Sequence, residues 1–187
     1  CANVLGGCYG STGPASTDPR TGRPYGGSFP RISISDMVRA QIALLDHLGI
    51  ERLHAAVGGS IGGLMVLELA MRFPERLARA IPIASGMEVT TLQRIHNFEQ
   101  IAAIQNDRNF RGGDYYDGEA PAEGLALARM IAHKTFVSLE MLAGRARDEI
   151  PADVEHLGTY ELSDRHESYM LHQGKKFTAR FDANSYL

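Results

Sequence analysis

Residues 53–74 read LHAAVGGSIGGLMVLELAMRFP and contain the pattern Gly-x-Ser-x-Gly at positions 58–62. An apolar run that favours a strand precedes the glycines, and a helical pattern follows them until Pro74. A serine on a sharp turn between a strand and a helix carries its hydroxyl clear of the sheet, and small residues around it let the backbone bend. The helix N-terminus also favours negative charge there. Ser60 is therefore a candidate nucleophile in a place that suits an oxyanion.

The same stretch has a plainer interpretation. A serine at the start of a helix often caps it, because its side-chain oxygen accepts a hydrogen bond from an unpaired backbone N–H group. A glycine-rich turn between a strand and a helix would then need no catalytic role. Four glycines around one serine exceed what a cap requires, so we favour the nucleophile.

Helical and strand-like segments alternate around this turn. A helix is expected from about residue 35, with Ser35 or Asp36 as its cap and Gly49 at its end. A short buried strand is expected at 53–57 and another apolar strand at 80–84, on either side of the helix that follows the serine. This alternation predicts an α/β fold with a parallel sheet.

Beyond residue 85 every periodic segment is helical, and no strand is expected. Helices are predicted near 91–105, 121–135, 138–148 and 164–173. Gly174 would end the last of them, and residues 111–118 would form an exposed loop that bears tyrosines. We therefore expect two parts. Residues 1–87 would be the portion of an α/β core that carries the nucleophile, and residues 88–187 would be a helical cap, or lid, over the catalytic edge of the sheet.

Charge and composition narrow the function classes. The chain has 187 residues and a net charge of −3, so a nucleic acid or a membrane surface, which needs a basic face, is not an expected partner. With no apolar stretch of about 18 residues and no leader-like segment, the chain reads as soluble and cytoplasmic. Cys1 and Cys8 match neither a disulfide framework nor a zinc pattern, so both are expected to be free thiols. A chain that starts at Cys1 is expected to be an excerpt from a longer protein.

A serine that transfers an acyl group needs a histidine base held by an acid, and in this type of sheet the two follow the serine in the order acid, then histidine. The downstream histidines are His96, His133, His156, His166 and His172. All lie in the helical half, whereas the base and the acid are expected on loops after later strands, outside residues 1–187, so none is assigned to the triad. His166 and Glu167 resemble part of a zinc-binding His-Glu-x-x-His helix, but position 170 is Met170, so no metal site is expected.

Arg129 lies inside the apolar segment 125–131, where a guanidinium is costly to bury without a partner. Its apolar stem can carry the charged group out to solvent, which is the default for a lone arginine. Its planar fork can instead hold a carboxylate through two hydrogen bonds. The residues by themselves leave both interpretations open.

Several segments together resemble one family. They are 3–8 (NVLGGC), 10–14 (GSTGP), 24–26 (PYG), 58–63 (GGSIGG), 124–129 (GLALAR) and 180–186 (RFDANSY). In combination they resemble the homoserine O-acetyltransferases of the α/β-hydrolase fold. The resemblance covers essentially the whole chain, and it implies a truncated α/β-hydrolase-like parallel sheet with a helical cap.

The resemblance implies transfer of an acetyl group from acetyl-CoA to the hydroxyl of L-homoserine, an early step toward methionine, with Ser60 carrying the acetyl group. The backbone N–H of Ile61 would be one oxyanion donor, and Arg129 would bind the homoserine carboxylate. Acetyl-CoA would be a co-substrate with no permanently bound cofactor, and the intact protein would be a homodimer formed through the cap. Phe136 departs from the family, which usually has there a tyrosine whose hydroxyl contributes to the acceptor site.

Other functions remain open. Succinyl-CoA as donor or serine as acceptor would suit the same class, because small changes in a pocket decide such preferences. A serine esterase, with water as the acceptor, is a second reading, and a non-enzymatic piece of a longer protein is a third. The 187-residue chain alone is expected to be inactive, because removing members of a triad costs several orders of magnitude in rate.

Overall fold

The computed structural model describes residues 2–148 and 156–187. These residues form two compact units. The first unit comprises Cys1–Ser16 and Phe29–Thr90, and the second comprises Thr17–Ser28 and Thr91–Leu187. The segment Thr17–Ser28 therefore belongs with the helical half, although it precedes the first strand in the sequence.

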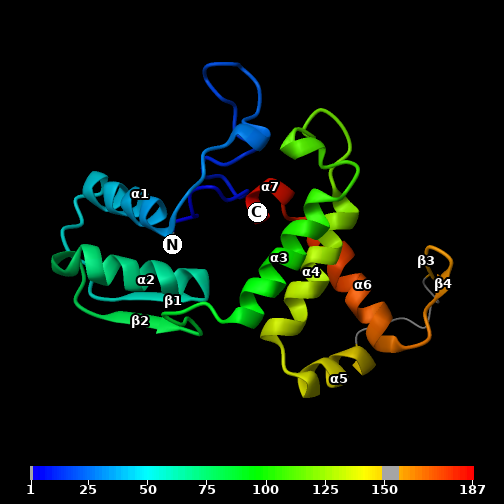
Figure 1. The fold of residues 1–187 in the computed structure, drawn as a ribbon. Coiled ribbons are helices and arrows are strands. Elements are labelled where there is room, and N and C mark those ends of the chain that lie inside the picture. Colours follow the sequence, from blue (N-terminus) through cyan, green and yellow to red (C-terminus); the bar gives the residue numbers. More distant parts are fainter. Residues whose placement is uncertain (1, 149–155) are drawn as a thin grey trace. The chain divides into compact units, whose positions relative to one another are not determined.

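The first unit is a small α/β layer. Its elements are α1 (Ile34–His47), β1 (Ala56–Gly59), α2 (Ile61–Arg72), the 3-10 turn η2 (Pro74–Arg76) and β2 (Ala80–Ile83). β1 and β2 pair in parallel, with Ala56 opposite Ala80. α2 packs against both strands, and α1 packs on α2 (Figure 1). The predicted parallel pairing of two strands across a helix is confirmed.

The core of the first unit lies between the helices and the strands. Its buried side chains are Val38, Ile42, Met65, Leu69 and Leu77. Ala56 packs against this core, so Val57, the next residue along the strand, faces the opposite way and is 62% exposed. The prediction that the first strand is buried is therefore wrong. The helices cover one face of the two strands, and the other face is open to solvent.

The ends of these elements differ from the expectation in detail. The cap of α1 is Ser33, not Ser35 or Asp36. Its side-chain oxygen accepts a hydrogen bond from the backbone N–H of Asp36 at 3.2 Å, and the Asp36 carboxylate accepts one from the backbone N–H of Ser33 at 2.9 Å. Gly49 follows the end of the helix with φ +69°, as predicted. The first strand starts at Ala56, because at Leu53 only an isolated bridge to Leu77 forms.

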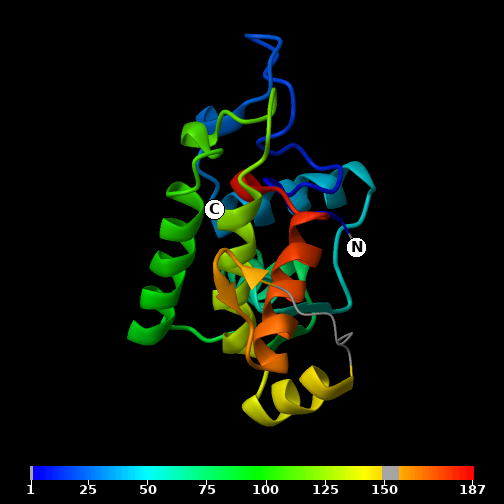
Figure 2. The same ribbon diagram turned by 90° about the vertical axis from the view of Figure 1, so that its right-hand side faces the viewer.

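The second unit is mainly helical. Its elements are η1 (Gly26–Ser28), α3 (Thr91–Gln105), η3 (Arg111–Gly113), α4 (Ala122–Phe136), α5 (Leu139–Asp148), β3 (His156–Leu157), β4 (Tyr160–Glu161), α6 (Arg165–Thr178) and α7 (Ala183–Tyr186). α4 lies between α3 and α6 (Figure 2). The core residues are Ile104, Phe110, Tyr115, Leu125, Ala128, Phe177 and Ala183. The four predicted helices are confirmed, whereas their role as a cap stays a prediction.

Three expectations for this unit are wrong. Gly174 does not end α6, which continues to Thr178. Gly174 is buried against α4 instead, where an added Cβ would lie 2.9 Å from the carbonyl oxygen of Ala126. Most residues of the loop 111–118 are exposed as expected, but its tyrosines are not: Tyr115 is 3% exposed and donates a hydrogen bond to Asp182 at 2.6 Å. A strand pair does occur after residue 85, but β3 and β4 have two residues each, too few to show a period.

Cys8 carries a free thiol, and Cys1 lies outside the described residues. Among the described helices, none combines the length and the hydrophobicity that crossing a bilayer requires.

Candidate active site

Ser60 stands at the sharp bend between β1 and α2. Its backbone has φ +54° and ψ −118°, a conformation that residues with a side chain rarely adopt. Such a residue costs about 1–3 kcal/mol and persists only where its surroundings hold it. The residue is exposed to solvent. The strand, bend and helix predicted around Ser60 are confirmed, and the strained backbone at this position is typical of a functional residue.

The glycines around Ser60 do not all serve the same purpose. A Cβ added at Gly58 would overlap the carbonyl oxygen of Gly62, so the backbone closes on itself across the bend and position 58 requires glycine. A Cβ added at Gly63 would overlap the side chain of Ser85. An added Cβ at Gly62 would meet nothing within 4 Å among the described residues. The two glycines that tighten the bend are therefore Gly58 and Gly63.

The structure contradicts the plainer interpretation of Ser60. Although Ser60 is the residue that precedes α2, its side chain makes no capping hydrogen bond. Its carbonyl oxygen instead accepts hydrogen bonds from the backbone N–H groups of Gly63 at 2.9 Å and Leu64 at 3.2 Å. The hydroxyl is thus not used to start the helix. Its role as the nucleophile stays a prediction.

Ile61 is the first residue of α2. Among the described residues, its backbone N–H donates to no backbone carbonyl, as is usual in the first turn of a helix. An N–H group directly after an acylated serine is well placed to donate a hydrogen bond to the oxyanion. The position suits the predicted role of Ile61, which stays a prediction.

Arg129 belongs to the second unit, on α4. Its guanidinium carbon lies 5.0 Å from the ring centre of Phe136 and 4.8 Å from that of Phe177. Burial lowers the pKa of Arg129, and the nearby Arg180 lowers it further. No ion pair between Arg129 and a carboxylate is present among the described residues. Arg129 is therefore a partly buried cation held by two aromatic rings, whose hydrogen-bond donors suit an incoming anion.

The sequence did not single out His133 as more than a packed or surface histidine. It lies one helical turn after Arg129, is 4% exposed, and its Nε2 lies 3.1 Å from the hydroxyl of Tyr169 on α6. Its ring packs edge-on against Phe136, at 5.4 Å between centres. Burial lowers the pKa of His133, and the charges of Arg129 and Arg145 lower it further. The i, i+4 spacing of Arg129 and His133 is the sequence signal that could have linked them.

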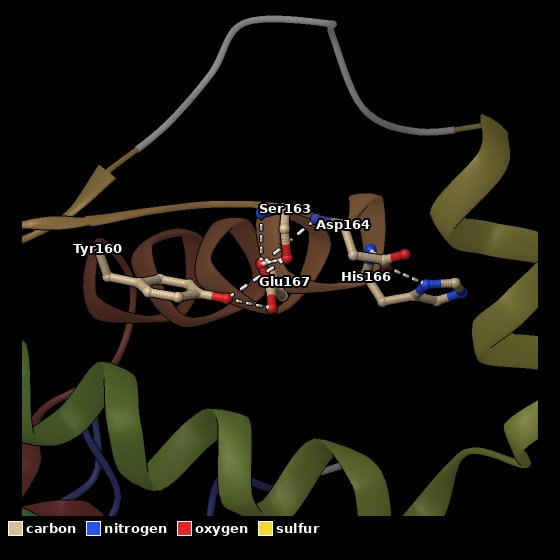
Figure 3. Close-up of polar contacts among 5 residues, drawn as sticks. All are labelled: Tyr160, Ser163, Asp164, His166 and Glu167. Carbon is tan, nitrogen blue, oxygen red and sulfur yellow. Dashed lines mark hydrogen bonds and ion pairs between the residues drawn. The ribbon is translucent and has the colours of Figure 1, made fainter.

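Two of the other downstream histidines, His96 and His166, make local contacts. His96 lies 2.9 Å from Glu99, and His166 contacts Asp164, the residue that caps α6 (Figure 3). Glu167 completes that cap by accepting hydrogen bonds from the backbone N–H groups of Ser163 and Asp164. The side chain of His156 lies outside the described residues. Within the described part of the chain no three potential metal ligands gather.

Comparison with known proteins places the chain in a family. The alpha/beta hydrolase fold family matches residues 1–184. The chain therefore belongs to the alpha/beta hydrolase fold family. It is 47% identical, over its whole length, to a homoserine O-acetyltransferase of Solidesulfovibrio magneticus, of which it covers 47%. The chain thus spans about half the length of that curated relative.

Solved structures give the same fold. The homoserine O-acetyltransferase from Bacillus anthracis matches 94% of this chain and 47% of its own, with a TM-score of 0.81 and 27% identity. The esterase E22 matches 94% of this chain and 48% of its own, with a TM-score of 0.81 and 26% identity. The fold is thus similar to that of both an acetyltransferase and an esterase.

Proposed function

We propose that the full-length protein containing this chain transfers an acetyl group from acetyl-CoA to the hydroxyl of L-homoserine. The observation that carries the proposal is the exposed, strained Ser60 at the N-terminus of α2, in a chain 47% identical throughout to a homoserine O-acetyltransferase. The name of that relative supports a role in methionine biosynthesis.

The proposed reaction has two halves, and Ser60 takes part in both. In the first, the Ser60 oxygen attacks the thioester carbonyl of acetyl-CoA, its proton passes to a general base, and the carbon–sulfur bond breaks to release the thiol of CoA. In the second, the hydroxyl of homoserine gives its proton to the base and attacks the acetyl carbonyl, the ester bond to Ser60 breaks, and the base returns the proton to the Ser60 oxygen. The N–H of Ile61 stabilises the oxyanion in each half, a contribution of about 3–4 kcal/mol for a typical donor. The base and its acid are expected in the rest of the full-length protein.

Arg129 is the proposed binding group for the carboxylate of homoserine. Its partial burial between Phe136 and Phe177 supports this role, because a guanidinium fixed by two rings loses little freedom when it binds an anion. Phe136 supplies such a ring but no hydroxyl. The acceptor site is therefore proposed to rely on Arg129 more than on a hydrogen bond from position 136.

The remaining proposals concern the whole protein. Acetyl-CoA is the proposed co-substrate, in preference to succinyl-CoA, and the cytoplasm is the proposed location. A homodimer through residues 88–187 is also proposed. Its support is the row of exposed apolar side chains on α3, namely Leu92, Ile95, Phe98 and Ile101. An open groove of about 820 Å³ between α3 and α4, which Phe98 and Leu127 help to line, borders this row.

A second candidate function is hydrolysis of acetyl esters, with water as the acceptor. The observation that favours it is the TM-score of 0.81 with the esterase E22, the same value as with the acetyltransferase from Bacillus anthracis. Both functions use an acylated serine, and they differ in what removes the acyl group.

The test measures release of the CoA thiol from acetyl-CoA by the full-length protein. The proposal predicts fast release with homoserine, little without it, and loss of several orders of magnitude in Ser60→Ala. Release or ester cleavage that is indifferent to homoserine would support the esterase and contradict the transferase. Substituting succinyl-CoA or serine in the same assay separates the related transferases.

A further inference from the structure

Ser85 follows β2 and reaches back to the bend that carries Ser60. Its hydroxyl lies 2.6 Å from the carbonyl oxygen of Ser60 and 3.1 Å from that of Ile83. A serine hydroxyl has one proton, and the shorter distance favours donation to Ser60. Ser85 thus contacts the backbone of the candidate nucleophile, although 25 residues separate the two in sequence.

The surrounding backbone is shaped to admit this contact. Ala84, just before Ser85, has φ +51°, a strained value for a residue with a side chain. On the other side, Gly63 leaves the space that the Ser85 side chain occupies, since a Cβ there would overlap it. The positive φ of Ala84 and the absence of a side chain at Gly63 thus let the hydroxyl of Ser85 reach the bend.

The contact matters because a peptide unit is rigid. The carbonyl of Ser60 and the N–H of Ile61 belong to the same planar group, so the donors to that carbonyl, which are the N–H groups of Gly63 and Leu64 and the hydroxyl of Ser85, together fix the direction of the N–H. Donation to the carbonyl oxygen also polarises the peptide and strengthens its N–H as a donor. That N–H is the one expected to hold the oxyanion.

We propose that Ser85 is a positioning residue for acyl transfer, which aims and polarises the oxyanion donor of Ile61 through the Ser60 carbonyl. The inference deepens the proposed function and rests on it, because it requires that Ser60 be acylated. The proposed role acts through the Ser60 carbonyl and requires no contact between Ser85 and the substrate. Its effect belongs to the transition state, where the negative oxygen forms, and hardly to binding of the substrate in its ground state.

The test compares full-length Ser85→Ala with wild type. The rate of Ser60 acylation, followed as release of nitrophenolate from p-nitrophenyl acetate, is expected to fall about 10- to 100-fold, less than the loss of a whole oxyanion donor. KM for homoserine is expected to stay within about twofold. A boronic acid that forms a tetrahedral adduct on Ser60 should bind more weakly by a factor similar to the loss in rate.

Two further variants separate this role from a structural one. Ser85→Thr keeps the hydroxyl and is expected to restore most of the rate. Ser28→Ala removes another serine hydroxyl that donates to a backbone carbonyl at 2.6 Å, to Tyr25, and is expected to leave the rate and the boronate affinity unchanged. If Ser85→Ala does not fold, Ser85→Cys, which keeps the volume with a weak donor, carries the same expectation.

The outcomes distinguish the role of Ser85 from the proposed function. If the wild-type protein is acylated and Ser85→Ala is acylated at the same rate, or binds the boronic acid with the same affinity, only the inference about Ser85 is overturned. If no acetyl donor acylates Ser60 in the wild-type protein, the proposed function is overturned, and the inference with it. Wild type that is acylated but ignores homoserine overturns the transferase and leaves the role of Ser85 measurable by ester cleavage.

Discussion

At the scale of single residues, the bend around Ser60 depends on where side chains are absent. The strand must end and the helix begin within one residue, so the backbone of position 58 approaches that of position 62. Glycine at 58 permits this approach, and the positive φ of Ser60 completes the turn. Of the two glycines in the pattern Gly-x-Ser-x-Gly, the bend therefore requires Gly58 and leaves room for a side chain at Gly62.

The two ends of the pattern give a matched pair of substitutions. Gly58→Ala is expected to destabilise the full-length protein by about 1–3 kcal/mol or more, because the new methyl group overlaps backbone that cannot move freely. Gly62→Ala adds a methyl group in open space within a helix and is expected to leave stability unchanged or to raise it by up to about 1 kcal/mol. Urea unfolding of both variants measures the difference. Equal losses would contradict the steric account.

Arg129 is tested through the two halves of the proposed reaction. Arg129→Lys keeps the charge but loses the planar fork, so kcat/KM for homoserine is expected to fall about 10- to 100-fold. The rate at which acetyl-CoA acylates Ser60 should not change. Arg94→Lys, on the exposed surface of α3, is the control and should change neither rate. An equal fall in both halves would show that Arg129 supports the fold and does not bind the acceptor.

At the scale of elements, α4 and α6 are held together by close backbone contact and a buried polar pair. Gly174 lets α6 approach Ala126, and further along the same helices His133 meets Tyr169. Nδ1 of His133 is buried and has no hydrogen-bond partner among the described residues. A histidine in such a place is tolerated while it is neutral and becomes costly once it carries charge.

This pair predicts a dependence of stability on pH. Because burial lowers the pKa of His133 in the folded protein, the unfolded chain binds a proton more readily. The contribution of His133 to folding stability is therefore fully present above about pH 6.5, the ordinary pKa of histidine. It is lost as the pH falls from there toward the lowered pKa of the folded protein. Urea unfolding of His133→Gln should show a smaller loss of stability between neutral and mildly acidic pH. The control His172→Gln, at an exposed position, should lose as much stability over this pH range as the wild type. Identical pH profiles of stability for wild type and His133→Gln would contradict the account.

The sequence could predict these elements where the pattern is long and local. The helices after residue 85 have clear periods, and the cap of α6 by Asp164 and Glu167 follows from residue types three apart. The role of Gly174 cannot be read from the sequence, because a glycine that ends a helix and one that lets two helices touch look alike there. The burial of Tyr115 depends on Asp182, 67 residues away, and no local signal shows such a pair. Ser85 was missed as a partner of Ser60 for the same reason.

At the scale of the whole molecule, the described chain exposes apolar surface that a self-sufficient protein would cover. Val57, Ile81 and Ile83 on the two strands are between 43% and 62% exposed. Open apolar strands favour association with other chains. The exposure fits a chain that spans about half the length of its curated relatives.

The isolated 187-residue chain is therefore expected to self-associate and to be inactive. Sedimentation velocity should show oligomers whose size grows with concentration. Val57→Lys, which places a charge on the open face of the strands, should shift the distribution toward smaller species. A concentration-independent monomer that unfolds cooperatively would contradict this expectation.

The central claim is that the hydroxyl of Ser60 accepts an acyl group from coenzyme A. The most direct measurement is mass spectrometry of the full-length protein after brief exposure to acetyl-CoA without homoserine. The account predicts one added acetyl group, on the peptide that contains Ser60, which disappears when homoserine is added and never forms in Ser60→Ala. An acetyl group on another residue, or turnover without any acylated Ser60, would contradict it.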